Sequence, residues 1–468
     1  MHFIICGGGI GGLATACALR AEGRQVTVLE RSKQLGEIGA AIQMKPNATR
    51  WLESFGIDVP SLKGVEVTRV TQYTRLDAPM MHQPIHATKM FGHPWLLTHR
   101  ADLHAGLKAQ ALSEADPKRG PPATIVTGVK ITDVNPASGT VIAVDGRTWK
   151  GDVVIGADGI SSAVRKSLFP HAPAPVAAMQ AAYRALIPRA AILDEPKLAP
   201  LLDPAQAGMV VWVGEDRRVV TYPCRDCDFI NIVAIFPDPA LVPEAQTHAN
   251  NVLGAATQQL RTSWPASLNR PSSTEELAAD FPDFPAHVRA LLSKAVDVSV
   301  WQLRDMDALP RWATERAVIV GDAAHAMLPH MGQGGSTAIE DAAAMRYIFQ
   351  GAEQSEVEFD PTSLPAVSAR LRAFEKLRLE RIHAIQDYSR AQGQPKVDEA
   401  KGHTMNALQF SKFAFGWPGF PAKDGNQEQS EGVRGATASF AQLDLKAGAG
   451  TASPAIPPAL QSPIVAAK

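Results

Sequence analysis

The sequence predicts an α/β protein in which a parallel-sheet domain is interrupted by a second, mixed or largely antiparallel sheet and followed by C-terminal helices. Three observations support this prediction. Residues 2–30 read as strand, glycine turn, helix and strand; residues 171–299 change to short strands among frequent prolines; and residues 315–327 return to a buried strand ending in Gly-Asp before a helix. With 468 residues, the chain is also too long for one simple core, so we expect two domains.

The bulk composition excludes several classes of partner. The chain has 46 Lys and Arg against 47 Asp and Glu, a net charge of −1, so no basic field attracts nucleic acid or anionic lipid. No run of 18 uncharged apolar residues predicts a membrane span. The N-terminal stretch lacks a basic segment and is broken by glycines, unlike a signal peptide. A cytoplasmic location is therefore the default expectation.

Cysteine and histidine spacing predicts no metal site. The four cysteines are too few for a disulfide scaffold: Cys6, Cys17, Cys224 and Cys227. The last two form a C-x-x-C, but no second pair completes four zinc ligands. Four histidines between residues 82 and 99 have spacings that match no ligand pattern. We interpret all these residues as structural.

The first motif is a glycine-rich turn between the first strand and helix. Gly7 permits a tight turn, Gly9 allows close backbone approach to a pyrophosphate, and Gly12 allows the helix to pack against the sheet. Glu30 ends the second strand and is followed by Arg31. A carboxylate there accepts hydrogen bonds from ribose hydroxyls and repels a 2′-phosphate, which favours FAD or NAD over NADP at this site.

Two further motifs follow strands later in the chain. Gly156-Ala-Asp-Gly-Ile-Ser-Ser-Ala-Val-Arg165 is a strand-to-helix connection with a serine cap. Gly321-Asp-Ala-Ala-His325 precedes Pro329 and the Gly-Gln-Gly-Gly run at residues 332–335. An Asp at such a strand end can bind a ribityl hydroxyl, and the next helix start can present N–H groups to a flavin ring.

In this order, the three motifs resemble those of the single-component FAD-dependent aromatic hydroxylases, the group that contains p-hydroxybenzoate and salicylate hydroxylases. The likeness runs from residue 2 to about 390, and the segments LGEIGAAIQMKPNATRWLESFG and THRADLHAGL are closest to the salicylate hydroxylase-like branch, which has fungal members. The resemblance implies a Rossmann-like FAD-binding domain at residues 1–170 and 300–390, and a substrate-binding domain at 171–299. Residues 391–468 are then a C-terminal extension, which we expect to be largely disordered beyond about 415.

The resemblance also implies the cofactors and the residues that hold them. FAD is expected to be tightly bound, with NADH or NADPH docking only transiently to reduce it. Oxygen is then inserted through a flavin C4a-hydroperoxide into a small phenolic or aromatic acid substrate, by a monomer or homodimer. The residues implied in FAD binding are Gly7, Gly9, Gly12, Glu30, Arg31, Ala41, Arg100, Asp158, Arg165, Asp322, Gly334 and Gly335.

Four residues are candidates for substrate binding and catalysis. Arg184 resembles the pocket arginine of fungal members, and Tyr222 resembles a pocket tyrosine on a facing strand. The alternatives are a surface ion-pair residue and a core aromatic side chain. Pro329 is expected to face the reacting position, and His330 is either a base or structural. His325 is interpreted as a structural hydrogen-bonding residue.

Rival functions remain on the same scaffold. A flavin epoxidase, or a heteroaromatic hydroxylase of the urate or nicotinate type, differs only in substrate. A non-oxygenating flavin oxidase or dehydrogenase is a more distant alternative, as is an inactive flavin-binding protein. Arg184, Tyr222 and Pro329 favour the hydroxylase over the inactive protein.

Overall fold

The computed structural model describes residues 1–21, 24–36, 40–114, 119–196, 198–238, 240–241, 269–350, 360–393 and 405–420. The chain separates into two compact units, Met1–Trp417 and Pro418–Lys468. All elements described below belong to the first unit. The prediction of a largely disordered tail beyond about residue 415 falls, from residue 421 onward, outside the described residues.

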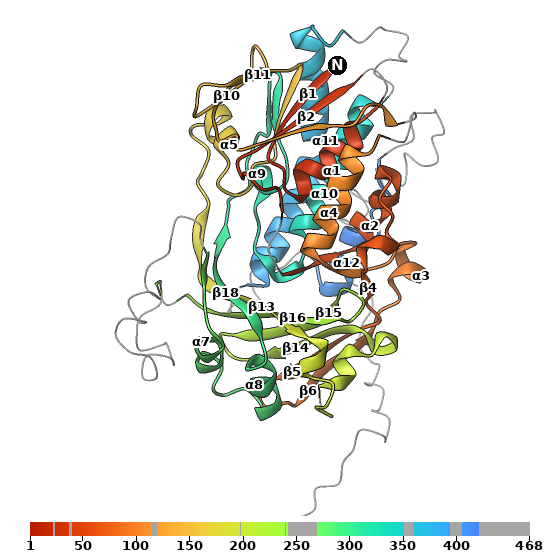
Figure 1. The fold of residues 1–468 in the computed structure, drawn as a ribbon, viewed down its shortest axis with the longest axis vertical. Helices are drawn as coiled ribbons and strands as arrows, with labels where there is room; N and C mark the ends of the chain where they lie inside the picture. Colours follow the sequence, from red (N-terminus) through yellow and green to blue (C-terminus); the bar gives the residue numbers. More distant parts are fainter. Residues whose placement is uncertain are drawn as a thin grey trace, which may run out of the picture. The chain divides into compact units, whose positions relative to one another are not determined.

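A six-stranded, mainly parallel sheet carries the glycine turn, in the order β19-β20-β12-β1-β2-β8 (Figure 1). Its strands are β1 (His2–Cys6), β2 (Gln25–Glu30), β8 (Thr124–Thr127), β12 (Val153–Gly156), β19 (Ala313–Thr314) and β20 (Ala317–Ile319). Every pair is parallel except β19–β20. The apolar run of β12 is buried throughout, as expected for a parallel strand covered on both faces. The predicted Rossmann-like core is confirmed.

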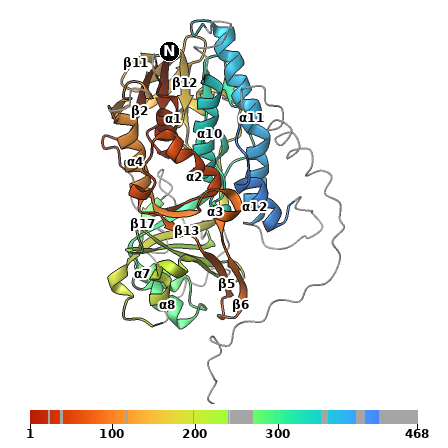
Figure 2. The same ribbon diagram turned by 90° about the vertical axis from the view of Figure 1, so that its right-hand side faces the viewer.

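Helices pack around this sheet, and Figure 2 shows α1, α10 and α11 running beside one another. The helices of this layer are α1 (Ile10–Leu19), α2 (Pro46–Leu52), α3 (Ala87–Phe91), α4 (Arg100–Leu112), α5 (Ala163–Leu168), α9 (Asp322–His325), α10 (Gly334–Phe349), α11 (Leu364–Ala391) and α12 (Ala407–Phe415). The alanine-rich α10 is buried along most of its length because it packs against both α1 and α11. The predicted C-terminal helices are present.

The second large sheet has eight strands in the order β17-β18-β13-β16-β15-β14-β5-β6. These are β5 (Arg69–Thr74), β6 (Pro79–Pro84), β13 (Val176–Pro188), β14 (Gly208–Val213), β15 (Arg218–Cys224), β16 (Phe229–Pro237), β17 (Asn269–Pro271) and β18 (Val296–Asp305). All pairs are antiparallel except β14–β5, so the predicted mixed sheet is confirmed. The parallel β14–β5 pairing brings residues 69–84 into this sheet, although a division at residue 171 assigns them to the first domain.

Two smaller sheets and several 3-10 helices complete the described fold. One three-stranded sheet contains β3 (Ala41–Met44), β7 (Leu96–His99) and β4 (Val65–Glu66), and another contains β11 (Thr148–Lys150), β10 (Thr140–Ala143) and β9 (Ile131–Asn135). The 3-10 helices are η1 (Glu53–Phe55), η2 (Pro60–Leu62), η4 (Arg189–Ala191), η5 (Ala199–Leu202), η6 (Pro204–Gln206) and η9 (Pro329–Met331). Strand β3 contacts both α10 and the β15–β16 part of the large sheet, which places it at the centre of the site described next.

The two faces of the eight-stranded sheet have different partners. One face packs on α7 (Thr274–Ala279) and α8 (Ala286–Leu292) through aromatic side chains, including Tyr183 and Phe236, whose rings stack 4.7 Å apart. On the other face, Ala182, Ile235 and Leu303 form an apolar cluster with Leu328, which precedes η9. No helix among the described residues is long and apolar enough to cross a membrane.

Candidate active site

The turn between β1 and α1 needs glycine at two positions and leaves open space at a third. Gly7 has φ +115°, and a Cβ there would lie 2.3 Å from the Ala157 carbonyl oxygen. A Cβ at Gly12 would lie 1.9 Å from the Gly7 carbonyl oxygen. At Gly9, which precedes α1, a Cβ would meet no described atom within 4 Å. The turn is therefore tightly packed at Gly7 and Gly12, whereas the space beside Gly9 is open.

Glu30, at the end of β2, shapes the same turn. Its Oε2 accepts a hydrogen bond from the Gly8 N–H at 2.7 Å, and its Oε1 accepts one from the Ser32 N–H at 2.8 Å. Arg31 is exposed beside it. Helix α1 begins with no side-chain cap and no acidic residue in its first turn. The positive end of its dipole is thus available to a phosphate.

The second motif caps a helix with its own side chains. The Asp158 carboxylate accepts hydrogen bonds from the Ser162 hydroxyl and from the N–H groups of Ala163 and Val164. Burial raises the pKa of Asp158 more than these hydrogen bonds lower it. In this arrangement Asp158 fixes the start of α5.

Arg165 of the same motif is buried. Its guanidinium donates to the carbonyl oxygens of Ala323 at 2.8 Å and Ile160 at 2.6 Å. Burial lowers the pKa of Arg165, and the nearby Asp158 and Asp322 partly offset that effect. The side chain thus ties α5 to α9. Its predicted contact with the cofactors stays a prediction, and this packing does not favour it.

The third motif places an exposed carboxylate beside a helix start. Asp322 begins α9 directly after Gly321, and its Oδ1 would lie 3.8 Å from a Cβ added at Gly334. A Cβ at Gly335 would lie 2.7 Å from the Ile42 Cδ1, so α10 closely approaches β3 there and a larger residue would require the Ile42 side chain to shift. Like α1, α10 has neither a side-chain cap nor an acidic residue in its first turn.

The starts of α1 and α10 lie near the same side chain. Cβ atoms added at Gly11 and Gly321 would each lie 3.4 Å from the Ala338 Cβ. Arg100 begins α4 after β7, and its N–H donates to the Ala40 carbonyl at 3.1 Å, which places it next to β3. Two uncompensated helix N-termini, an exposed carboxylate and β3 therefore border one region.

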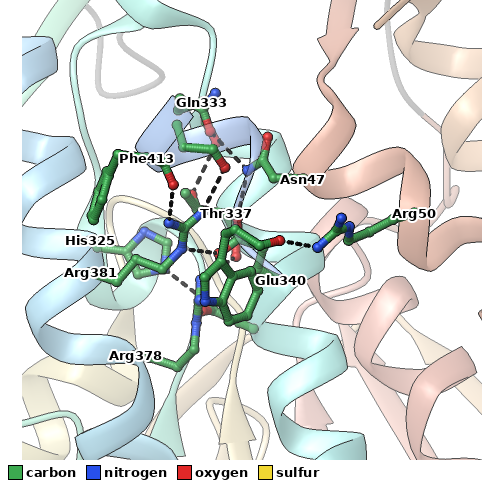
Figure 3. Close-up of polar contacts among 12 residues, drawn as sticks. Asn47, Arg50, His325, Gln333, Thr337, Glu340, Arg378, Arg381 and Phe413 are labelled. Carbon is green, nitrogen blue, oxygen red and sulfur yellow. Dashed lines mark hydrogen bonds and ion pairs between the residues drawn. The ribbon is translucent and has the colours of Figure 1, made fainter. Parts of the chain in front are cut away.

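A buried ionic network supports this region (Figure 3). His325 Nε2 lies 2.6 Å from the Asp341 Oδ2, which also accepts from the Gly321 N–H at 2.9 Å. The Arg378 guanidinium reaches Asp341 at 2.9 Å and Glu340 at 2.6 Å. Burial raises the pKa of Asp341, but its interactions with His325 and Arg378 outweigh burial and lower the pKa overall. His325 is fully buried and holds this hydrogen bond, which favours its structural interpretation.

The same network reaches the residues after β3. Arg381 donates to both oxygens of Glu340, at 2.8 and 2.9 Å, and the Asn47 Nδ2 donates to Glu340 at 2.6 Å. The roles of Glu340, Asp341 and the two arginines were not predicted from their sequence. Two acidic residues inside an otherwise alanine-rich helix, and two arginines three positions apart on α11, were the available signals.

On the side of the eight-stranded sheet, two predicted substrate residues lie near β3. The buried Tyr222 has its hydroxyl 3.5 Å from the Ala41 carbonyl oxygen. The Asn231 Oδ1 accepts from the Ala41 N–H at 2.9 Å. Arg184 lies over the Trp301 ring, 4.7 Å from its centroid, and its charge acts on Tyr222. The structure therefore brings Arg184, Tyr222 and Ala41 together.

The Tyr222 hydroxyl stays protonated. Burial, and then Cys224, raise its pKa far above the ordinary value, whereas Arg184 and a hydrogen bond with Gln43 lower it less. The Gln43 Oε1 has no hydrogen-bond partner among the described residues, and it would lie 3.1 Å from a Cβ added at Gly332. Tyr222 is thus a neutral donor between the sheet and the glycine-rich run.

His330 has a different environment from Arg184 and Tyr222. It follows Pro329 in η9, and its Nε2 would lie 2.4 Å from a Cβ added at Gly393. Neither ring nitrogen has a hydrogen-bond partner in the described part of the chain. Burial, aided by Arg218, lowers the pKa of His330 to about 3. A group with this pKa is a weak base near neutral pH, so this environment favours the structural alternative.

Two residues of the site were not identified from the sequence. Asn231 interrupts the apolar run of β16, and Gln43 lies in β3, so a polar residue inside each short apolar strand was the only signal. The C-x-x-C thiols are buried and free, and burial raises the pKa of Cys224 to about 12. No cluster of three metal-ligating side chains occurs within the described ranges.

With this geometry in view, comparison with known proteins is decisive. The family model described as FAD binding domain matches residues 1–351. The chain belongs to the FAD-dependent aromatic hydroxylase family. It is 30% identical to hispidin-3-hydroxylase of Neonothopanus nambi, over 82% of this chain and 86% of that protein. It is 31% identical to 3-hydroxybenzoate 6-hydroxylase 1 of Aquipseudomonas alcaligenes, over 83% and 88%.

Solved structures agree with this assignment. A salicylate hydroxylase substrate complex superposes with a TM-score of 0.67 at 26% identity, covering 89% of this chain and 95% of that one. A Klebsiella pneumoniae protein solved with FAD and uric acid has a TM-score of 0.65 at 22% identity, covering 94% and 97%, which shows the shared fold. The chain is an FAD-dependent monooxygenase.

The residues present fit FAD. The open space at Gly9 faces the uncapped start of α1, which suits a pyrophosphate. Glu30 carries carboxylate oxygens beside that turn for a ribose. The uncapped start of α10, with Asp322 next to it, offers N–H groups and an acceptor to the remaining part of the cofactor.

Proposed function

We propose that this monooxygenase uses NAD(P)H and O2 to hydroxylate a phenolic or aromatic acid substrate bound between β3 and the eight-stranded sheet. The observation that carries the proposal is the position of Arg184 and Tyr222, which share the sheet face that contacts Ala41. The names of the relatives, which include hydroxylases of hydroxybenzoate and hispidin, support this class of substrate.

Arg184 is the proposed anion-binding residue. Its guanidinium can bind a carboxylate or phenolate through two hydrogen bonds, and its position over Trp301 limits its orientations. Tyr222 is the proposed neutral donor to an oxygen on the ring, because its raised pKa keeps the proton in place. Together they orient the ring toward β3 and the glycine-rich run. Pro329 lies at that end, and His330 remains a weaker candidate for a base.

The apolar cluster of Ala182, Ile235, Leu303 and Leu328 is proposed to restrict water at the reacting position. When bound, FAD supplies the electron transfer from the nicotinamide and the activation of O2. Exclusion of water protects this chemistry against unproductive loss of reduced oxygen. The cluster joins the sheet to the segment before η9, so it closes the site on the side next to Pro329.

The cofactor contacts and the domain division extend this proposal. Residues 1–170 and 300–390 would hold FAD, apart from β5 and β6, and residues 171–299 would bind the substrate. The residues proposed to contact FAD are Gly7, Gly9, Gly12, Glu30, Arg31, Ala41, Arg100, Asp158, Arg165, Asp322, Gly334 and Gly335. NADH or NADPH would dock transiently.

The deciding experiment is a screen for ligand-stimulated NADH and NADPH consumption by the purified yellow protein. The panel contains salicylate, 3-hydroxybenzoate, 4-hydroxybenzoate, a larger phenol and urate, with the product identified by mass under ¹⁸O2. We expect a phenolic acid to stimulate turnover and one labelled oxygen atom to enter the product. Arg184→Met should raise KM strongly, whereas the exposed control Arg147→Met should not. Stimulated turnover without label in the product contradicts the proposal.

A further inference from the structure

Asn231 is a completely buried polar residue in the middle of an apolar strand. Its Oδ1 accepts the Ala41 N–H at 2.9 Å, but its Nδ2 has no hydrogen-bond partner among the described residues. A buried donor left without a partner is destabilising. An aliphatic side chain would avoid this cost, so we expect the amide to find its acceptor in a bound ligand.

The orientation of this amide is set by the backbone. Ala41 presents an N–H group, which is only a donor, so the oxygen of the Asn231 amide must face it. Exchange of oxygen and nitrogen would oppose two donors and leave the Oδ1 without a partner instead. The direction of the two Nδ2 protons is therefore determined, and they point away from the Ala41 N–H.

The neighbours of Asn231 define what an acceptor would meet. Tyr222 on β15 and Leu186 on β13 are its register partners, so all three side chains share one face of the sheet. Arg184 lies two residues from Leu186 on β13 and shares that face. It is a diagonal neighbour of Asn231, and such residues are about 7–8 Å apart in antiparallel sheets, with their Cβ atoms somewhat closer. A substituted aromatic ring can span this distance.

We infer that Asn231 is a specificity-determining residue whose Nδ2 donates a hydrogen bond to a second oxygen substituent of the substrate ring. This inference rests on the proposed function, and it narrows the substrate class. The ring carries an anionic carboxylate or phenolate for Arg184 and a separate hydroxyl or carbonyl oxygen for Asn231. The Asn231–Ala41 hydrogen bond links recognition of that second oxygen to the strand that borders the cofactor site.

The test replaces the hydrogen-bond donor with an acceptor in a side chain of nearly the same shape. Asn231→Asp keeps an oxygen for the Ala41 N–H but replaces the Nδ2 protons with a second acceptor. We would measure the Kd of salicylate, 3-hydroxybenzoate and benzoate by calorimetry on the FAD-bound protein. In the wild type, at least one hydroxybenzoate should bind about tenfold or more tightly than benzoate. At about pH 8 this preference should be lost in Asn231→Asp.

Acid should restore the preference in this variant. A buried Asp has a raised pKa, and its protonated form again combines an acceptor with an O–H donor. The ratio of variant to wild-type affinity should therefore recover as the pH falls to about 5.5. Use of this ratio cancels any titration of the ligand itself, because the ligand is the same in both measurements. Asn231→Ala, which has neither group, should lack the preference at every pH. A residue that only holds Ala41 would produce no such recovery.

The control is Asn135→Asp, an exposed asparagine on β9 whose Oδ1 accepts from two backbone N–H groups. The inference is overturned if the wild type shows no preference, or if Asn231→Asp keeps it at about pH 8. It is also overturned if Asn231→Asp loses bound FAD, because the amide then serves the cofactor. Selective hydroxybenzoate binding through Asn231 without any hydroxylated product would instead contradict only the proposed function.

Discussion

The glycine turn after β1 and the sheet face opposite β3 are built in opposite ways. In the turn, Glu30 satisfies the N–H groups of Gly8 and Ser32, and glycines allow atoms to pack at distances that no side chain permits. Between this sheet face and β3, buried polar atoms of Asn231 on β16 and Gln43 on β3 have no partner among the described residues. The conformation of the glycine turn is thus fixed by contacts within the chain. The sheet face and β3 instead leave hydrogen-bond donors and acceptors for a ligand.

The largest effect is expected from substitutions inside the turn. In Gly12→Ala, the new Cβ would lie 1.9 Å from a backbone oxygen, so the turn must shift and we expect loss of bound FAD and of thermal stability. Gly9→Ala has open space and an extended backbone, so it should melt like the wild type yet bind FAD more weakly, because the methyl group occupies the approach to the pyrophosphate. Visible absorbance and thermal unfolding of both variants test this contrast.

Equal behaviour of the two glycine variants would contradict the contrast. If Gly9→Ala retains wild-type FAD affinity, the open space beside Gly9 is not the pyrophosphate site. If Gly12→Ala retains both FAD and stability, the close contact between Gly12 and the Gly7 carbonyl does not determine the conformation of the turn.

Removing Arg378 should be the next largest effect. Its side chain is fully buried between Glu340 and Asp341, so Arg378→Met leaves both carboxylates with fewer positive partners. Breaking such a buried ion pair costs about 3–5 kcal/mol. Urea unfolding should show this loss, and the exposed control Arg372→Met should change the free energy of unfolding by less than about 0.5 kcal/mol. A small loss for Arg378→Met would mean that this buried ion-pair network contributes little to stability.

Tyr222→Phe should affect ligand binding far more than stability. Its hydroxyl is 3.5 Å from the Ala41 carbonyl, a weak hydrogen bond whose loss costs the fold less than about 1 kcal/mol. Loss of a donor to the substrate should lower kcat/KM about tenfold to a hundredfold. The matched control is Tyr73→Phe, whose ring stacks on Trp212 at the far end of the sheet. An unchanged kcat/KM would mean that Tyr222 is only a core aromatic residue.

The same contrast explains what the sequence could predict. Gly9, Gly12 and Glu30 act through neighbours within about thirty residues, so the spacing of the motif identified the turn, although Gly7 also packs against the distant Ala157. Asn231 acts through Ala41, 190 positions away, and only the register of the eight-stranded sheet brings them together. Arg184 and Tyr222 came from a family resemblance, because nothing in their local sequence distinguishes them from ordinary strand residues.

The predictions for His330 and Arg165 had a different difficulty. Both residues occupy the positions that the motifs predict, but burial determines their pKa values and contacts. Their burial depends on segments that are distant in the sequence. Gly393, at the end of α11, packs on the His330 ring, and Ala323 accepts from the Arg165 guanidinium. Neither contact leaves a signal in the local sequence.

Lys45 carries a buried amine next to β3. It directly follows β3, and its Nζ lies 3.7 Å from the Trp95 ring centroid and 5.1 Å from that of Phe415. The rings favour the ammonium form. Burial acts in the opposite direction and lowers the pKa of Lys45 from 10.5 to about 7. Its charge state is therefore decided by the balance between burial and the two rings.

Lys45→Met should have an effect on stability that depends on pH. Between about pH 7 and 10.5 the unfolded wild type binds more protons than the folded form, so wild-type stability rises with pH. The thioether has no charge, so the variant should be the more stable form at pH 7 and below. Its advantage should shrink by up to about 1.4 kcal/mol per pH unit above pH 7. Urea unfolding from pH 6.5 to 9.5 tests this, with the exposed Lys166→Met as control. A constant difference would show that the aromatic rings, not burial, set the charge of this amine.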